Sequence, residues 1–360
     1  MTNITNKESY FACADTCAGF INYFGNIFDS QNLEKLYIVK GDIKSLFLKE
    51  IAKTAEEKKY ASEYILCPYN PEYLYGVLIK DLKIAIIDEK LYTHDDNIII
   101  ENIINFNDFY NESKLTKRKK EISELKIKKA EYINSAYKFL TAANELCENI
   151  TELSKKYIYR EKLICSVQRL IDKYIGKKHL QENNINYYAD EYIFINSISF
   201  LENIELNIFE NEAKKIFYIS NECFLGWYYI NIIISKCGNL CKVICPDTLN
   251  PRNIRAVYLK NLKILFVIKD KTSDKDKIKI YDNKYHFINI KRFLNINIKK
   301  ENKQKLKFIQ KCYKAIINEA VKYFKEADII NSAVENIYAS AIKINEKNKY
   351  TENIIKNIFT

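Results

Sequence analysis

The sequence predicts an α/β protein made of two tandem copies of one unit, each a parallel sheet followed by a long helix or a helical hairpin. Two observations lead to this prediction: an internal repeat, and runs of strand character that alternate with helical spacing. A chain of 360 residues with 48% hydrophobic content is long enough for two domains. We expect the first repeat with its helical tail to cover 1–176 and the second to cover 177–360.

The repeat aligns without a gap over fifteen residues. Asn70–Ile84 matches Asn250–Ile264, with Asn, Pro, Val, Lys, Leu, Lys and Ile recurring in register, and the same offset carries Lys35–Val39 onto Lys215–Ile219. All four prolines follow equivalent cysteines, Pro68 and Pro71 after Cys67, and Pro246 and Pro251 after Cys245. Because proline lacks an N–H and fixes φ, both pairs mark the same strand end. The two halves therefore share one fold.

Local patterns predict the elements of each half. In the first half we expect a strand at Leu36–Val39, a helix from about Ser45 to Lys58, a strand at Glu63–Cys67, a loop, and a strand at Lys83–Asp88. A strand, helix and strand in succession imply a right-handed crossover and a parallel sheet.

The end of each half has helical spacing. Between Tyr132 and Tyr174 apolar residues recur every three or four positions without Gly or Pro, and Lys303 to about Ile342 should close the second half in the same way. We expect these helices to pack within the molecule; an intermolecular coiled coil is the alternative.

The first strand and helix of each half have the context of a phosphate-binding loop. In the pattern G-x-x-x-x-G-K-[ST], backbone N–H groups and the Lys surround phosphates, and the hydroxyl ligates Mg²⁺. The first half supplies Gly41 and a Lys44–Ser45 pair that opens the helix. Its loop is about three residues too short for the pattern, and Asp42 adds negative charge where a phosphate would lie.

The second half has the opposite defect. From Asn221 the loop has full length and ends in Gly226, but Trp227 and Tyr228 occupy the Lys and Ser/Thr positions. The first copy keeps the Lys–Ser pair and lacks the full loop, whereas the second keeps the loop and lacks the pair. A composite site would need the loop of the second copy and Lys44 of the first to reach the same phosphate. We predict that the Trp227 indole packs into the space that phosphates would enter, so that side chains fill the second site. The alternative is that Trp227 starts the helix and faces the neighbouring core.

Asp88 ends an apolar strand, as the Mg²⁺-associated acid of phosphate-loop folds does. The counterpart strand ends Val267-Ile268-Lys269, so the second copy lacks this acid. Asp88 is either a possible Mg²⁺-associated acid or a solvated residue at a strand end.

Together these segments resemble an uncharacterised bacterial family of duplicated P-loop ATPase-like proteins, over essentially the whole chain. The segments that carry the resemblance are Tyr10–Ala12 with Gly19-Phe20, Leu36–Ser45, Cys67 with Gly76-Val77, Leu82–Asp88, Ile103–Tyr110 and Ala136–Leu140. The resemblance implies tandem P-loop NTPase domains, with ATP and Mg²⁺ as ligands if the first site functions. Members carry a complete loop in each half, Cys-Ser-Ser after the second strand, and Asp-Gly-Thr with a nearby Pro-His after the third. This chain reads Cys67-Pro68-Tyr69 and Asp88-Glu89-Lys90, with His94 only roughly placed.

Cysteine and histidine patterns predict neither a metal site nor a nucleophile. Cys237, Cys241 and Cys245 are spaced four apart, but Leu240–Cys245 has strand character, and residues four apart on a strand are about 13 Å from one another. Cys13 and Cys17 lack further ligands. The three histidines, His94, His179 and His286, stand in different segments.

Charge and composition leave several partners open. The formal net charge is +11, and basic runs begin both helical tails, at Lys114, Lys117, Arg118, Lys119 and Lys120, and at Lys299, Lys300, Lys303, Lys305 and Lys307. These runs are either solvated helix starts or a face that contacts a nucleic-acid backbone. The polar N-terminus and the absence of a long apolar run indicate a cytoplasmic protein with no membrane partner.

The leading hypothesis is a pseudo-ATPase that serves as a scaffold or interaction module, with weak or no nucleotide binding and an unknown protein partner. Its vestigial nucleotide-binding residues are Gly41, Lys44, Ser45 and Gly226. The first alternative is an ATP-binding ATPase or kinase-like enzyme that uses the first repeat with Asp88 near Mg²⁺. The second is a nucleic-acid-binding module, whose affinity would fall steeply with salt.

Overall fold

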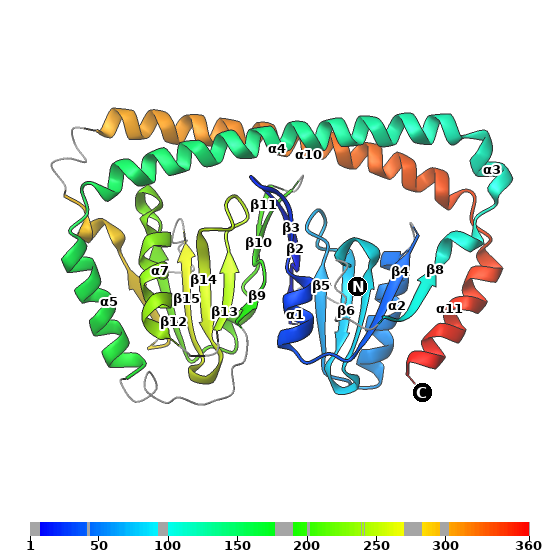
Figure 1. The fold of residues 1–360 in the computed structure, drawn as a ribbon, viewed down its shortest axis with the longest axis horizontal. Helices are drawn as coiled ribbons and strands as arrows, with labels where there is room; N and C mark the ends of the chain where they lie inside the picture. The colour runs from blue at the N-terminus through cyan, green and yellow to red at the C-terminus, as the bar shows by residue number, and fades with distance from the viewer. Residues whose placement is uncertain are drawn as a thin grey trace.

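The computed structural model describes residues 8–41, 44–92, 100–176, 190–199, 202–238, 240, 242–269, 283–295 and 302–359. The described chain forms two α/β units side by side beneath a pair of long helices (Figure 1). Each unit contains one six-stranded sheet and one small two-stranded hairpin.

The two large sheets have the same topology. Their strand orders are β1-β5-β6-β7-β4-β8 and β9-β13-β14-β15-β12-β16, read from corresponding edges. The first sheet consists of β1 (Ser9–Tyr10), β4 (Lys35–Lys40), β5 (Ser62–Leu66), β6 (Leu74–Ile79), β7 (Ile84–Asp88) and β8 (Ile100–Asn105). The second consists of β9 (Glu191–Tyr192), β12 (Lys215–Ser220), β13 (Lys242–Pro246), β14 (Ile254–Leu259), β15 (Ile264–Lys269) and β16 (Tyr285–Ile288). The structure thus confirms the duplication at the level of strand order.

Both sheets are mixed, so the prediction of parallel sheets is wrong in part. β4, β7 and β8 are parallel, as are β12, β15 and β16, but β6 and β14 run antiparallel to both of their neighbours. The sequence interpretation placed a loop where β6 lies. A turn closed by the Tyr73 N–H on the Asn70 carbonyl, at 2.9 Å, sends the chain back along β5. Gly76 allows a close approach within β6, because a Cβ there would lie 3.1 Å from side chains of both flanking strands, Ile65 and Ile87.

The helices follow the repeat as well. They are α1 (Phe24–Ser30), α2 (Lys44–Glu57), α3 (Glu112–Lys117), α4 (Lys119–Lys155), α5 (Arg160–Tyr174), α7 (Leu225–Cys237), α10 (Lys303–Ala339) and α11 (Ile344–Ile358). Short 3₁₀ turns are η2 (Lys80–Leu82), η3 (Glu89–Leu91), η4 (Phe106–Phe109), η5 (Ile208–Glu210), η6 (Glu222–Phe224), η7 (Lys260–Leu262) and η8 (Ile290–Phe293).

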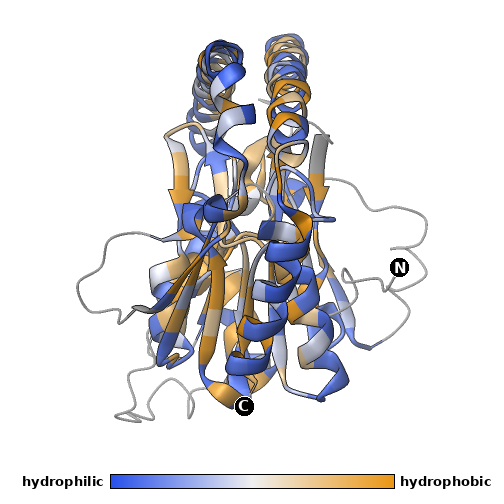
Figure 2. Ribbon diagram, turned by 90° about the vertical axis from the view of Figure 1, so that its right-hand side faces the viewer, coloured by the Kyte–Doolittle hydropathy of each residue, from blue (hydrophilic) through white to orange (hydrophobic). Residues whose placement is uncertain are grey.

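The two long helices pack antiparallel on each other within the chain, as predicted. Lys129 Nζ donates to Asn331 Oδ1 at 2.6 Å, and the rings of Phe139 and Tyr323 stack at 5.4 Å. Figure 2 shows apolar residues gathered on the strands, while the long helices carry both apolar and polar residues. Among the helices that the structure describes, none combines the length and apolar character needed to cross a membrane.

The helical tails are exchanged between the two units (Figure 1). α4 has 37 residues and is about 55 Å long, so it carries the chain past its own unit. α5 then packs on the second unit, where Leu163 and Val167 share a core cluster with Phe217 and Ile230. α11 packs on the first unit, where Ile358 joins a cluster with Phe47 and Phe106. The division at residue 176 remains a prediction about the repeat in sequence; in space each tail belongs to the other unit's core.

A local twofold relation joins the units at their inner edges. The hairpins β2 (Cys13–Thr16) with β3 (Gly19–Asn22), and β10 (Asn196–Ser199) with β11 (Glu202–Glu205), lie beside this junction. Phe11 and Phe194 exchange both backbone hydrogen bonds, at 3.1 and 2.8 Å. One buried apolar cluster contains residues of both units.

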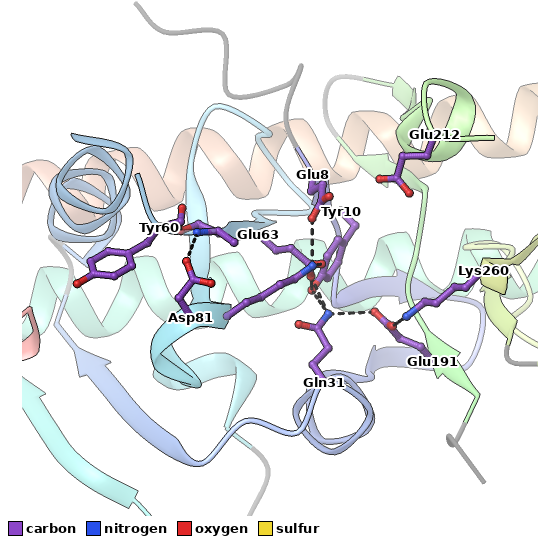
Figure 3. Close-up of polar contacts among 12 residues, drawn as sticks. Glu8, Tyr10, Gln31, Tyr60, Glu63, Asp81, Glu191, Glu212 and Lys260 are labelled. Atoms are coloured by element: carbon purple, nitrogen blue, oxygen red, sulfur yellow. Dashed lines mark hydrogen bonds and ion pairs between the residues drawn. The ribbon is translucent and has the colours of Figure 1, made fainter. Parts of the chain in front are cut away.

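A polar network also crosses the junction (Figure 3). Gln31 Nε2 donates to Glu63 Oε2 at 2.6 Å and to Glu191 Oε1 at 3.2 Å, and so connects carboxylates of the two units. The repeat-equivalent Lys80 and Lys260 pair with Glu63 and Glu191, respectively. Burial alone would raise the pKa of Glu63, but Lys80 and hydrogen bonds from Gln31 and Tyr10 outweigh it, so the pKa lies below its ordinary value.

Acid should therefore weaken the fold partly through Glu63. Because its folded-state pKa is lowered, its stabilising effect is present above the unfolded pKa of about 4.3 and is lost as the pH falls below it. We expect the Glu63→Gln protein to lose less unfolding free energy on acidification, by up to about 1.4 kcal/mol per pH unit. Urea unfolding between pH 7 and about pH 3 measures this difference. Glu57→Gln, at an exposed side chain, is the control. Parallel curves for Glu63→Gln and the unmodified protein would show that this carboxyl is not held in its charged form.

Candidate functional site

The candidate sites lie where the parallel strands end. In each unit these carboxyl ends face the pair of long helices (Figure 1). Ligands of open α/β sheets bind at this edge, and both predicted phosphate loops belong to it.

In the first unit the structure brings Lys44 and Asp88 together. Lys44 opens α2, and its Nζ lies 2.8 Å from Asp88 Oδ1 and 3.1 Å from Glu89 Oε1. Burial lowers the pKa of Lys44, but the two carboxylates outweigh burial and raise it. The ammonium group is therefore charged at neutral pH and already paired within the protein.

Gly41 and Ser45 lie at the same edge but contact protein atoms. Ser45 Oγ accepts a hydrogen bond from the Leu74 N–H at 3.2 Å. Gly41 has a φ of 107°, and a Cβ there would lie 3.0 Å from the Cβ of Phe106. Asp42, like His94 and His179, lies outside the described residues. The close approach of Gly41 to η4 explains why this position needs glycine without invoking a ligand.

In the second unit, the loop from Asn221 to Gly226 is held by a hydrogen bond from its own backbone to its own side chain. Asn221 Oδ1 accepts a hydrogen bond from the Gly226 N–H at 3.1 Å, at the start of α7. A Cβ on Gly226 would lie 2.9 Å from this same oxygen. Cys223 and Phe224 both adopt left-handed φ angles, 54° and 59°, which tightens the turn before the helix. An amide that a phosphate loop would offer to its ligand is thus satisfied internally.

Trp227 is buried, but it does not fill the second site. The indole is 5% exposed and stacks on Phe224 with ring centroids 5.2 Å apart, and Phe224 meets Tyr313 of α10 edge-on at 5.6 Å. These rings form a wall of a cavity of about 730 Å³ between the strand ends and α10. The prediction that side chains fill the second site is therefore wrong. The stacked rings of Phe224 and Trp227 pack towards α10, and the cavity beside the strand ends remains open.

Sequence reasoning missed two cations of this cavity, the buried Arg255 and the partly buried Lys269. Arg255 on β14 lies 3.3 Å from Asp247 and 3.4 Å from Glu205, and Lys269 at the end of β15 lies 3.6 Å from Glu205 and 3.7 Å from Glu210. The repeat alignment contained the signal, since Arg255 stands where the first copy has Tyr75 and Lys269 where it has Glu89. Positions at which two copies differ in charge are candidates for a function that only one copy has.

The remaining candidates show no shared site. Cys237 ends α7 and Cys245 lies in β13, while Cys241 is outside the described residues. Within the described ranges, no group of three or more His, Cys, Asp or Glu side chains is arranged to hold a metal ion. His286 on β16 stacks on Phe217 at 4.9 Å, which gives it a packing role.

The basic runs begin at opposite ends of the helix pair (Figure 1). The side chains of Lys114, Lys117, Lys119 and Lys120 are exposed at one end, and those of Lys305 and Lys307 at the other. Lys299 and Lys300 lie outside the described residues. The two runs therefore do not form one continuous basic face within the described chain.

No protein-family model matches the chain, and comparisons with curated proteins and with solved structures find no match.

Proposed function

We propose that the protein is a degenerate tandem P-loop NTPase-like scaffold, a pseudo-ATPase that binds nucleotide weakly or not at all. The observation that carries this proposal is that groups expected to hold phosphate are already engaged by the protein. Lys44 pairs with Asp88 and Glu89, and the Gly226 amide is bonded to Asn221. To bind a phosphate chain, the protein would have to break these contacts, and the lost ion pairs would offset the new ones.

The exchanged tails support a scaffold role. Each unit completes its core with a helix from the other half, so the two units hold one another in a fixed arrangement. Such a framework presents two related surfaces at a constant separation, which suits an interaction module.

Isothermal titration with Mg-ATP tests the proposal. We expect binding no tighter than about 1 mM, which corresponds to about −4 kcal/mol. We also expect no ATP turnover that depends on Lys44. Lys44→Ala is compared with Lys53→Ala, an exposed position on the same helix. Micromolar binding, or steady turnover that only Lys44→Ala abolishes, would overturn the proposal.

One contact favours a second candidate, an ATPase or kinase-like enzyme that uses the first repeat. Lys44 and Asp88 are neighbours, as the phosphate-binding Lys and the Mg²⁺-associated acid of such enzymes are. Under this candidate, ATP and Mg²⁺ together would separate the pair, and Asp88→Asn would abolish turnover while leaving the fold intact. The same titration therefore distinguishes the two candidates.

A further inference from the structure

We propose that the cavity of the second unit binds an uncharged, planar heteroaromatic molecule that carries a hydrogen-bond acceptor such as a ring carbonyl. The cavity has a volume of about 730 Å³ and lies between the carboxyl ends of β12, β15 and β16 and the helix α10. This volume falls within the range of small-molecule sites, about 300–1,000 Å³. The inference goes beyond the pseudo-ATPase proposal, because it concerns a ligand without phosphates.

The buried charges beside the cavity are paired within the protein. Arg255 lies 3.3 Å from Asp247 and 3.4 Å from Glu205. Lys269 lies 3.6 Å from Glu205 and 3.7 Å from Glu210. These cations are therefore engaged by carboxylates, and neither offers a free positive charge to an anion.

The remaining lining charges leave neither sign in large excess. Lys291 lies 3.6 Å from Glu222, and Lys314 is exposed on α10. Together with Asp247, Glu205 and Glu210, Glu222 makes four carboxylates, which offset the four cations that line the cavity. A charged ligand would add a charge without a counterpart, which is costly away from water. An uncharged ligand avoids this cost.

Two side-chain amides supply hydrogen-bond donors to the cavity. Asn221 and Asn289 line it and follow the ends of the neighbouring strands β12 and β16. Asn221 Oδ1 accepts from the Gly226 N–H at 3.1 Å, and Asn289 Oδ1 accepts from the Lys291 N–H at 3.0 Å. Each oxygen is thus held by the backbone, while neither Nδ2 has a partner within the described chain. Two neighbouring NH₂ groups suit an acceptor on the ligand. The first copy has Gly41 in place of Asn221, so it lacks this pair.

Two buried groups of the lining residues are also unsatisfied. Trp227 Nε1 and Asn196 Oδ1 have no hydrogen-bond partner within the described chain, although these residues are only 5% and 2% exposed. Buried polar groups are rarely left unsatisfied. Both groups are neutral, one a donor and one an acceptor, and so agree with an uncharged polar ligand rather than with an ion.

Aromatic side chains supply a flat wall. Phe224 and Trp227 stack with an interplanar angle of 15°, and both line the cavity together with Tyr313. Such a wall favours a planar ring, since aromatic rings pack well on one another in offset or edge-on arrangements.

The test uses three dyes that separate ring, acceptor and charge. 7-Amino-4-methylcoumarin is uncharged, flat and carries a ring carbonyl, and its 3-acetate derivative adds a carboxylate to the same rings. N-Phenyl-1-naphthylamine is uncharged and has no carbonyl. Trp227 is the only tryptophan of the chain and lines the cavity, so energy transfer from its fluorescence reports a dye bound there. We expect the coumarin to quench Trp227 and to bind at least about tenfold more tightly than its acetate derivative.

Variants assign the coumarin binding to the amide donors. Asn221→Asp with Asn289→Asp keeps the oxygens that accept the backbone N–H groups and removes both NH₂ groups. This change should weaken coumarin binding at least about tenfold and leave the naphthylamine unchanged. The control, Asn70→Asp with Asn111→Asp, makes the same change in net charge at residues whose Oδ1 also accepts a backbone N–H and that do not line the cavity.

If the double variant does not show a cooperative melting curve, Asn289→Asp alone replaces it, since that side chain is exposed. Coumarin binding that the cavity variants do not change, or a loss that the naphthylamine shares, would overturn the inference and indicate general apolar binding only. An acetate derivative that binds as tightly as the coumarin would also overturn it, because the cavity would then accept an anion. None of these results would restore ATP binding, so the pseudo-ATPase proposal is tested separately by the Mg-ATP titration.

Discussion

The Ile358→Ala protein is expected to lose about 2–5 kcal/mol of unfolding free energy, although the residue lies near the end of the chain. Ile358 is 5% exposed and belongs to the core cluster of the first unit, together with Phe47 and Phe106. Removing its side chain leaves a cavity in a core that this unit cannot complete by itself. Leu163→Ala in α5 should have a loss of the same size, because Leu163 is fully buried against the second unit.

Urea unfolding measures both losses, and Ile344→Ala is the matched control. Ile344 begins α11 but is 62% exposed, so its replacement should change the unfolding free energy by no more than about 0.5 kcal/mol. If Ile358→Ala were as mild as Ile344→Ala, α11 would not be part of the core.

Restoring the loop residues of the second unit, by Trp227→Lys with Tyr228→Ser, should destabilise the protein by about 2–4 kcal/mol without creating ATP binding. The double change removes a buried indole from its stack on Phe224 and places an ammonium group at a position that is only 5% exposed. The Asn221 side chain would still occupy the Gly226 amide.

Thermal unfolding and Mg-ATP titration of the double variant test this expectation. Trp227→Phe is the control, since it keeps an aromatic ring in the wall and should cost less than the double change. A double variant that gained ATP affinity at an unchanged melting temperature would show that the loop needs only its Lys and Ser to work.

The duplication could be predicted from the sequence because the proline positions and the ungapped alignment of the two halves can be read directly from it. Pro68 and Pro246 lie at equivalent strand ends, and Lys35–Val39 and Lys215–Ile219 lie within equivalent strands. β6 was missed for an equally local reason, since Asn70-Pro71 and Gly76 read as loop residues. They form a tight turn and a close strand packing instead, and this antiparallel strand makes the sheet mixed.

The tail exchange could not be predicted from periodicity. The spacing in α5 shows which face is apolar, but both units share one fold, and the pattern does not say which of them this face covers. The length of α4 determines which unit α5 covers, because an unbroken helix of 37 residues carries the chain to the far unit.

The roles of the site residues stay predictions, although Lys44 and Asp88 lie 2.8 Å apart at one edge of the first sheet. The cavity was missed, because aromatic residues in a row suggested a filled loop, whereas the packing of Phe224 against Tyr313 depends on where α10 lies. Contacts of this kind, between segments that are far apart in the sequence, cannot be recognised from the sequence of either segment alone.

Amide hydrogen exchange of the two core variants tests most directly whether each unit is completed by the other half's tail. In the Ile358→Ala protein, we expect faster exchange in α2 and η4 of the first unit and unchanged exchange in α7 and β12. In the Leu163→Ala protein, we expect faster exchange in α7 and η8 of the second unit and unchanged exchange in α2 of the first. If Ile358→Ala instead loosened α7 and the second sheet, α11 would belong to its own half, and the exchange of tails would be wrong.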